Sequence, residues 1–153
     1  MKIPLKLKEE IKNVENTQFI ERRIILPVNI IGRKIVGAEF IIDTGCPYSF
    51  INYITLLNLN LPKNECKVKK MVIGGSLVDI FSIPTLKLYL KTEKGEIFIL
   101  KTDCLNVAMP SEANEKEKAH AYTLPNILGL DFLIHHKLKL FLNLSENVQY
   151  LEV

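Results

Sequence analysis

Apolar and polar positions alternate along most of the chain, which is the pattern of β-strands that bury one face. The apolar runs come in pairs separated by short turn sequences, so we predict β-hairpins. The paired runs are residues 22–31 with 34–42, 66–73 with 76–83, 86–91 with 96–101, and 137–143 with 148–153.

Two segments have the spacing of helices instead. Apolar residues recur at helical intervals from Ser49 to about Leu57, and Ser49 is a suitable N-cap. A second short helical run follows Gly129. Residues 109–124 are polar and charged, so they are interpreted as a solvated surface loop. The pattern predicts a small, mostly antiparallel β domain with one or two short helices.

The composition narrows the class of protein. A chain of 153 residues, 48% of them hydrophobic, is long enough for one domain with a sizeable core. The net charge of +3 is small and scattered, so we expect no nucleic-acid partner. The basic segment 1–12 lacks the apolar stretch of a signal peptide, and no apolar run is long enough to span a bilayer, so we expect no membrane association.

Cysteine usage bears on location and on metals. The chain has three widely spaced cysteines, Cys46, Cys66 and Cys104, with no CxxC spacing. This pattern argues against a disulfide framework and against a zinc site. We therefore expect reduced, mostly buried thiols in a cytoplasmic protein that needs no metal and no cofactor.

Asp43 is the candidate for chemistry. It follows the apolar residues 40–42 and precedes Thr44-Gly45. A carboxylate at the end of a core strand loses solvent, which disfavours its charged form unless a partner compensates. Asp and Gly are also common turn residues, so the triplet alone fits an ordinary turn as well.

Three elements occur in an order that resembles the retropepsin-like aspartic proteases. They are residues 27–45, which end in Asp-Thr-Gly, residues 69–77 with their Gly-Gly turn, and residues 126–133, "NILGLDFL". The resemblance extends from about Pro27 to about Leu142. It implies the small, closed β-barrel-like acid-protease fold over residues 27–144. An extension of residues 1–26, which is a candidate strand or interface segment, precedes this fold, and a closing strand at 145–153 follows it.

The resemblance also implies roles for individual residues. Asp43, Thr44 and Gly45 would form the catalytic loop, and Gly129 would support that loop from below. Ile73, Gly74 and Gly75 would form the tip of a flap over bound peptide, although an ordinary hairpin turn remains the alternative for the two glycines. Cys46 stands where the family usually has alanine or serine.

The chain contains one Asp-Thr-Gly, and Asp131 is not in such a triplet. By resemblance, the second aspartate comes from a second copy of the chain. The sequence therefore predicts a homodimeric aspartic endopeptidase acting on extended polypeptide. The alternative is a dimerisation or peptide-binding module with little or no hydrolysis. Either the segment before Pro27 or residues 137–153 would build the shared interface, and the sequence does not choose between them.

Overall fold

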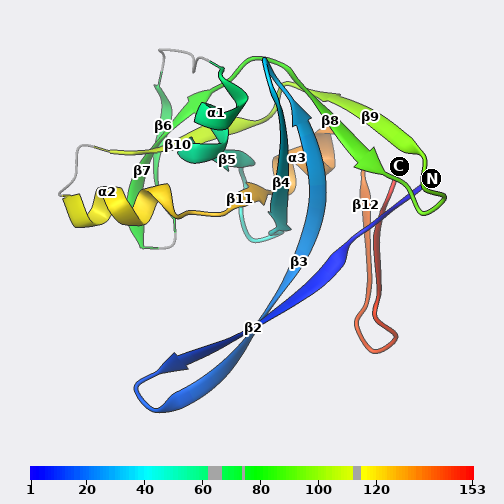
Figure 1. Ribbon diagram of the computed structural model, residues 1–153, viewed down its shortest axis with the longest axis horizontal. Helices are drawn as coiled ribbons and strands as arrows, with labels where there is room; N and C mark the ends of the chain where they lie inside the picture. Colours follow the sequence, from blue (N-terminus) through cyan, green and yellow to red (C-terminus); the bar gives the residue numbers. More distant parts are fainter. Residues whose placement is uncertain (62–66, 74, 112–114) are drawn as a thin grey trace.

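The computed structural model describes residues 1–61, 67–73, 75–111 and 115–153 (Figure 1). Two residues named above, Cys66 and Gly74, lie outside these ranges. The elements are β1 (Lys2–Pro4), β2 (Lys6–Val14), β3 (Thr17–Ile31), β4 (Ile35–Ile42), β5 (Phe50–Asn52), α1 (Tyr53–Leu59), β6 (Lys67–Ile73), β7 (Ser76–Ser82), β8 (Leu86–Lys91), β9 (Ile97–Thr102), β10 (Asn106–Pro110), α2 (Glu115–Tyr122), β11 (Asn126–Leu128), α3 (Leu130–His135), β12 (Lys139–Asn143) and β13 (Val148–Glu152).

Most strands belong to one sheet. Its hydrogen-bonded order is β6-β7-β10-β5-β11-β4-β3-β8-β9, and β2 pairs with β3 beside this path. A second sheet has the order β1-β13-β12. The mostly β architecture predicted from the alternation is confirmed, and so are the four hairpins, each of which pairs antiparallel.

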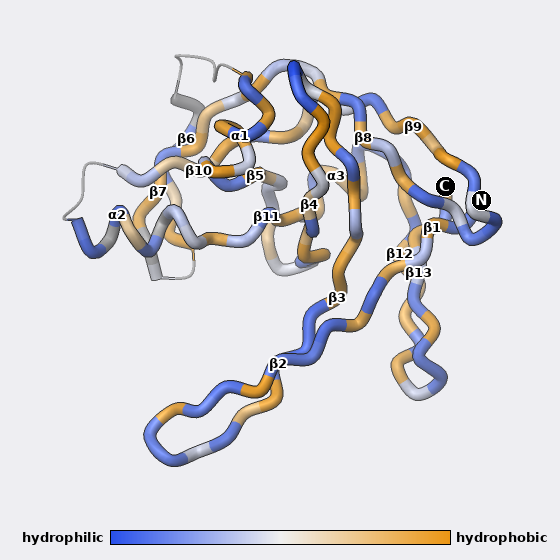
Figure 2. Tube along the Cα trace, in the orientation of Figure 1, coloured by the Kyte–Doolittle hydropathy of each residue, from blue (hydrophilic) through white to orange (hydrophobic). Residues whose placement is uncertain are grey.

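The core lies where the inward faces of these strands meet. On β3, Leu26, Val28 and Ile30 are buried at every second position, and Phe40 and Ile42 do the same on β4. Figure 2 shows hydrophobic positions recurring along the strands of the body. A smaller cluster is centred on Phe50, Val78, Ile80, Ala108, Leu124 and Ile127. Strand alternation thus fixes which side chains enter the core.

The predicted helix at residues 49–57 begins later than expected. Residues 50–52 are strand β5, and α1 starts at Tyr53 with Asn52 as its N-cap, because Thr55 N donates to Asn52 Oδ1. The helix ends at Leu59, and its C-cap, Asn60, has a left-handed conformation. Ser49 is not a cap, since its hydroxyl is hydrogen-bonded elsewhere.

The surface loop predicted at residues 109–124 is wrong over much of its length. Its start belongs to β10, which pairs with β7 antiparallel and with β5 in parallel. Residues 115–122 form α2, which adds a third helix to the one or two expected. The segment is rich in Glu, Lys and Ala, which all favour helices. It has no apolar periodicity, so the sequence pattern did not indicate a helix. The ring of Tyr122 at its end lies 5.6 Å from that of Tyr53.

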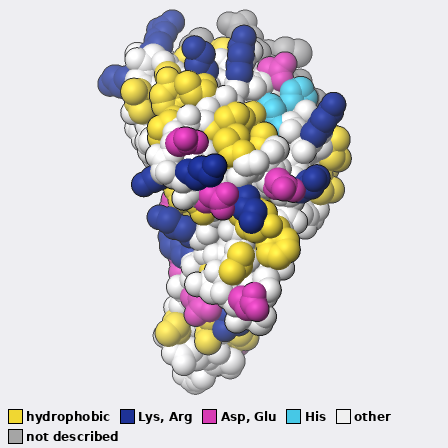
Figure 3. All heavy atoms as spheres, turned by 90° about the vertical axis from the view of Figure 1, so that its right-hand side faces the viewer, with side chains coloured by type: hydrophobic (Ala, Val, Ile, Leu, Met, Phe, Trp, Pro, Cys, Tyr) yellow, Lys and Arg dark blue, Asp and Glu magenta, His cyan; other side chains and the backbone are white. Residues whose placement is uncertain are grey.

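The two ends of the chain meet in the three-stranded sheet. β1 pairs with β13, and Val153 N donates to Met1 O at 2.9 Å. Figure 3, which views the molecule from the right-hand side of Figure 1, shows hydrophobic patches interspersed with charged side chains above a narrow lower part. Both segments that sequence reasoning proposed for an interface thus contribute strands to one sheet within a single chain.

Residues 6–23 form a long two-stranded projection, called the arm here. It comprises β2 and the first half of β3, and the pairing of these strands runs from Lys6↔Ile25, at the base of the arm, to Val14↔Thr17 at its tip. Figure 1 shows it leaving the body of the molecule. Within the described ranges, no helix is long and apolar enough to cross a membrane.

Candidate active site

Asp43 lies where two parallel strands end side by side. β4 ends at Ile42, and β11 pairs with it in parallel with Ile42 opposite Leu128. Asp43 N donates to Leu128 O at 3.0 Å, so the pairing continues one step beyond the strand. The chain leaves both strands at this edge, and the carboxylate of Asp43 is therefore carried on the sheet rather than on a free loop.

The backbone turns tightly after Asp43. Cys46 N donates to Asp43 O at 3.1 Å, and Gly45 N donates to Asp43 Oδ1 at 2.9 Å. Among the described residues, Oδ2 accepts no hydrogen bond. Asp43 is half-buried, whereas Thr44 and Gly45 are exposed. The desolvation expected for this carboxylate is therefore incomplete in a single chain, and its neighbours Thr44 and Gly45 are accessible to solvent.

Gly129 lies directly beneath this loop. A Cβ at this position would lie 2.4 Å from Cys46 O and 2.6 Å from Tyr48 O, closer than any real side chain is found. The close approach brings the next two residues within hydrogen-bonding distance of the loop. Leu130 N donates to Cys46 O at 2.9 Å, and Asp131 N donates to Pro47 O at 3.3 Å. The contact requires glycine, because even a methyl group would push the loop away.

Asp131 and Ser49 tie the same loop to α3. Ser49 donates to the Asp131 carboxylate through both its backbone N, at 3.0 Å, and its hydroxyl, at 2.5 Å. The hydroxyl also accepts a hydrogen bond from Gly129 N at 2.8 Å. Ser49 is completely buried, so these bonds are shielded from water. This contact, which we call the Ser49–Asp131 clasp, was missed because helical spacing assigned Ser49 to a cap.

The β6–β7 hairpin lies beside the Asp43 loop. Met71, Ile73 and Cys46 all pack against the smaller core cluster, which joins the hairpin to the loop. Lys69 Nζ donates to the hydroxyl of Tyr48 at 2.9 Å and lies 4.4 Å from the centre of its ring. The structure thus brings the predicted flap and the predicted catalytic loop together on one side of the molecule.

The tip of this hairpin has the geometry of a tight turn. Ile73 pairs with Ser76, and Gly75 has φ of 81° with no atom within 4 Å of where its Cβ would be. Gly75 is therefore in a backbone conformation that other residues adopt only with strain. Both interpretations, an ordinary turn and a mobile flap tip, are compatible with this conformation.

The described cysteines are free thiols. Cys46 and Cys104 are half-buried rather than fully buried, and burial is the main cause that raises the pKa of each. Cys46 Sγ donates to Tyr48 O at 3.1 Å. Both thiols are therefore protonated and weakly nucleophilic at neutral pH. In the part of the chain that the structure describes, no three His, Cys, Asp or Glu side chains are arranged to hold a metal ion.

No family model matches the chain, and no curated protein matches it. Among solved structures, it is similar to EIAV protease complexed with the inhibitor HBY-793, with a TM-score of 0.47, 20% identity, and coverage of 80% of this chain and 95% of that one. It is also similar to the retroviral protease-like domain of Ddi1 from Leishmania major, with a TM-score of 0.46, 16% identity, and coverage of 84% and 91%. Because both TM-scores are below 0.5, the proposed function depends on this chain's own residues.

Proposed function

We propose that this chain is one half of an aspartic endopeptidase, and that two copies join so that their Asp43 side chains form a single catalytic pair. The observation that carries the proposal is the placement of Asp43. Its loop is fixed by the sheet edge and by Gly129, and Gly45 N donates to its carboxylate, yet Asp43 stays half-buried and Thr44 and Gly45 are exposed. A loop fixed this firmly around one half-buried carboxylate is what half of a shared site requires.

The chemistry explains why a second copy is needed. Two carboxylates held close together share one proton, because like charges at short range do not both ionise. The charged member removes a proton from water, whose oxygen attacks the scissile carbonyl carbon, while the protonated member donates to the carbonyl oxygen. Protonation of the amide nitrogen then lets the C–N bond break. One aspartate does not fill both roles at once.

The substrate class follows from the surroundings of Asp43. A peptide entering between the Asp43 loop and the β6–β7 hairpin would lie extended and pair through its backbone. Ile73, Gly74 and Gly75 would close over it and exclude water, as flaps do in enzymes of this chemistry. Thr44 and Gly45, both exposed in the single chain, would face the second copy. No cofactor or metal enters this scheme.

The test is to mix Asp43→Asn chains with wild-type chains under conditions that allow subunits to exchange. Asparagine is close to aspartate in size but does not cycle as acid and base, so a mixed dimer is expected to be inactive. With random exchange at equal amounts, about a quarter of dimers keep both aspartates, and activity per wild-type chain falls to about half. Asp103→Asn, which changes an exposed carboxylate that pairs with His135, is the matched control and should cause no loss.

Cleavage of an unfolded protein substrate is the readout, and isotope-labelled subunits report exchange. If excess Asp43→Asn chain leaves wild-type activity intact despite exchange, the shared pair is refuted. If the wild-type chain dimerises and binds peptide but never cleaves it, the binding-module alternative replaces the enzyme.

A further inference from the structure

The arm has no cover within its own chain. All residues from 11 to 20 are exposed, including Ile11 at 66% and Ile20 at 55%. These two isoleucines lie directly opposite each other on the two strands. An isolated two-stranded ribbon is at best marginally stable in water. The arm therefore needs a surface to pack against.

The register places the arm at the Asp43 edge of the molecule. β3 pairs with β4 as far as Ile25, which lies opposite Ile41, and β4 ends one residue later. Beyond this point, β3 continues into the arm without β4 beside it. Figure 1 shows the arm extending past the loop that follows β4. The arm thus leaves the body at the same edge as Asp43, which is the edge where the proposed pair requires the second copy.

One face of the arm continues the inner face of the sheet. On β3, the buried side chains of Ile30, Val28 and Leu26 alternate with outward ones, and Ile24 is still packed against the core. Following the same alternation, Ile20 lies on this face, with Ile11 beside it. Figure 2 shows hydrophobic segments recurring along the arm. The face that packs on the core within the body therefore carries two exposed isoleucines on the arm, next to the opposed pair Arg22 and Glu9.

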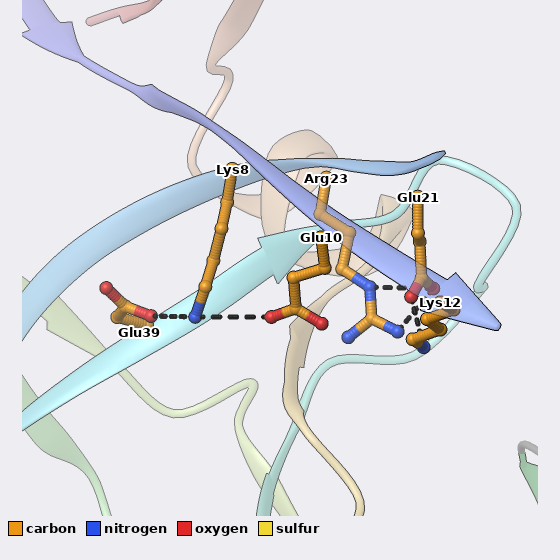
Figure 4. A network of polar contacts seen from close by, with 6 residues as sticks. All are labelled: Lys8, Glu10, Lys12, Glu21, Arg23 and Glu39. Carbon is orange, nitrogen blue, oxygen red and sulfur yellow. Dashed lines mark hydrogen bonds and ion pairs between the residues drawn. The ribbon is translucent and has the colours of Figure 1, made fainter. Parts of the chain in front are cut away.

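The charges of the arm are largely satisfied within the arm and its base. Figure 4 shows Lys8 between Glu10 and Glu39, and Glu21 between Lys12 and Arg23. Lys12 and then Arg23 lower the pKa of Glu21 through hydrogen bonds. On the Ile11–Ile20 face itself, Arg22 pairs with Glu9 at 2.8 Å. An arm with both signs of charge paired internally is not suited to nucleic acid or to an anionic membrane.

We propose that the arm of each copy packs its Ile11–Ile20 face against the body of the other copy, across the two-fold axis that relates the two Asp43 residues. This inference rests on the proposed function, because the shared pair is what places the second copy at this edge. Two-fold symmetry makes the contact reciprocal, so both arms are covered at once. The arms then hold the two half-sites together, and this contact between copies is called the arm contact below.

The first test removes the apolar surface and keeps the strand. In the double variant Ile11→Thr/Ile20→Thr, threonine preserves β-branching while it loses most of the apolar character. The matched control is Ile97→Thr/Ile99→Thr on β9, where the exposed fractions of 57% and 52% are similar. Four isoleucines are lost per dimer, so we expect the dissociation constant to rise about a hundredfold in the arm variant and to stay unchanged in the control. Sedimentation equilibrium measures both.

The second test identifies what the arm contacts. Photoreactive p-benzoylphenylalanine replaces Ile20, and labelled and unlabelled chains are mixed before irradiation. Cross-linked peptides that join a labelled to an unlabelled chain are expected at about half of all links, since partners combine at random. Links confined to single chains would overturn the proposal, because the arm would then fold onto its own body.

The outcomes of these tests distinguish a failure of the arm proposal from a failure of the proposed enzyme function. If the wild-type chain dimerises, Ile11→Thr/Ile20→Thr leaves the dissociation constant unchanged and no links form between chains, the arm contact is overturned and the shared Asp43 pair still stands. A wild-type chain that stays monomeric at tens of micromolar overturns both. A weakened dimer in the arm variant, together with links between chains, supports the arm contact even if no peptide is ever cleaved.

Discussion

Replacing Gly129 by alanine should displace the loop that carries Asp43. The added methyl would meet Cys46 O at 2.4 Å and Tyr48 O at 2.6 Å, both backbone atoms that no side-chain rotation can move. Each contact would have to open by roughly half an ångström to reach an allowed distance. That movement also stretches the hydrogen bonds that Leu130 N and Asp131 N donate to the loop.

The cost can be estimated from these contacts. Two weakened backbone hydrogen bonds cost about 1 kcal/mol each, and overpacking adds about 1–3 kcal/mol. A total of about 3–5 kcal/mol corresponds to a fall of roughly 6–20 °C in the midpoint of thermal unfolding for a domain of this size. Displacement of a catalytic group by a fraction of an ångström should also lower kcat at least about tenfold.

Gly37→Ala is the matched control. Gly37 lies within β4, and a Cβ there would meet only Asn29 Oδ1, at an ordinary 3.5 Å. Its effect on unfolding should stay within about 1 kcal/mol. Circular dichroism at one fixed protein concentration measures both midpoints, and peptide cleavage measures kcat. If Gly129→Ala unfolds at the same temperature as Gly37→Ala, then Gly129 does not brace the loop.

Two further predictions concern the flap and the response to pH. Gly75 and Gly95 have almost equal φ, 81° and 82°, and open space around them, so valine should destabilise both sites alike. Only Gly75→Val should slow cleavage, and equal turnover in the two variants would show that Gly75 is not part of a flap. Burial lowers the pKa of His136, so its contribution to stability is complete above the unfolded pKa of 6.5 and is lost as pH falls through the folded pKa. Between pH 7 and about pH 5 the unfolding midpoint should therefore fall less in His136→Gln than in the wild type, and an unchanged slope would contradict this.

The alternation of apolar residues and the turn residues predicted those elements whose contacts are close together in the sequence. The hairpin that leads into Asp43 and the turn at Gly75 follow from alternation and turn residues within about 20 positions. The close approach of Gly129 to the loop agrees in position with what the family resemblance implies, although the role of Gly129 stays a prediction.

The remaining features depend on contacts or on environments that a single sequence does not reveal. Ser49 has the sequence context of a helix cap, and only the approach of Asp131 from 82 residues away makes it part of the clasp. α2 has few apolar positions, so periodicity does not detect it. The arm was predicted only as an extension with a possible strand, because its charges obscure the alternation that the pairing of β2 and β3 makes visible.

The Ser49–Asp131 clasp also determines when the site is formed. Closing a loop of about 80 residues carries a substantial entropic cost and slows folding relative to local hairpins. Because synthesis proceeds from the N-terminus, the Asp43 hairpin leaves the ribosome long before residues 129–131 are made. A nascent or truncated chain therefore carries the Asp43 carboxylate without the support that positions it, so the emerging polypeptide has no organised Asp43 loop until most of the protein has been translated.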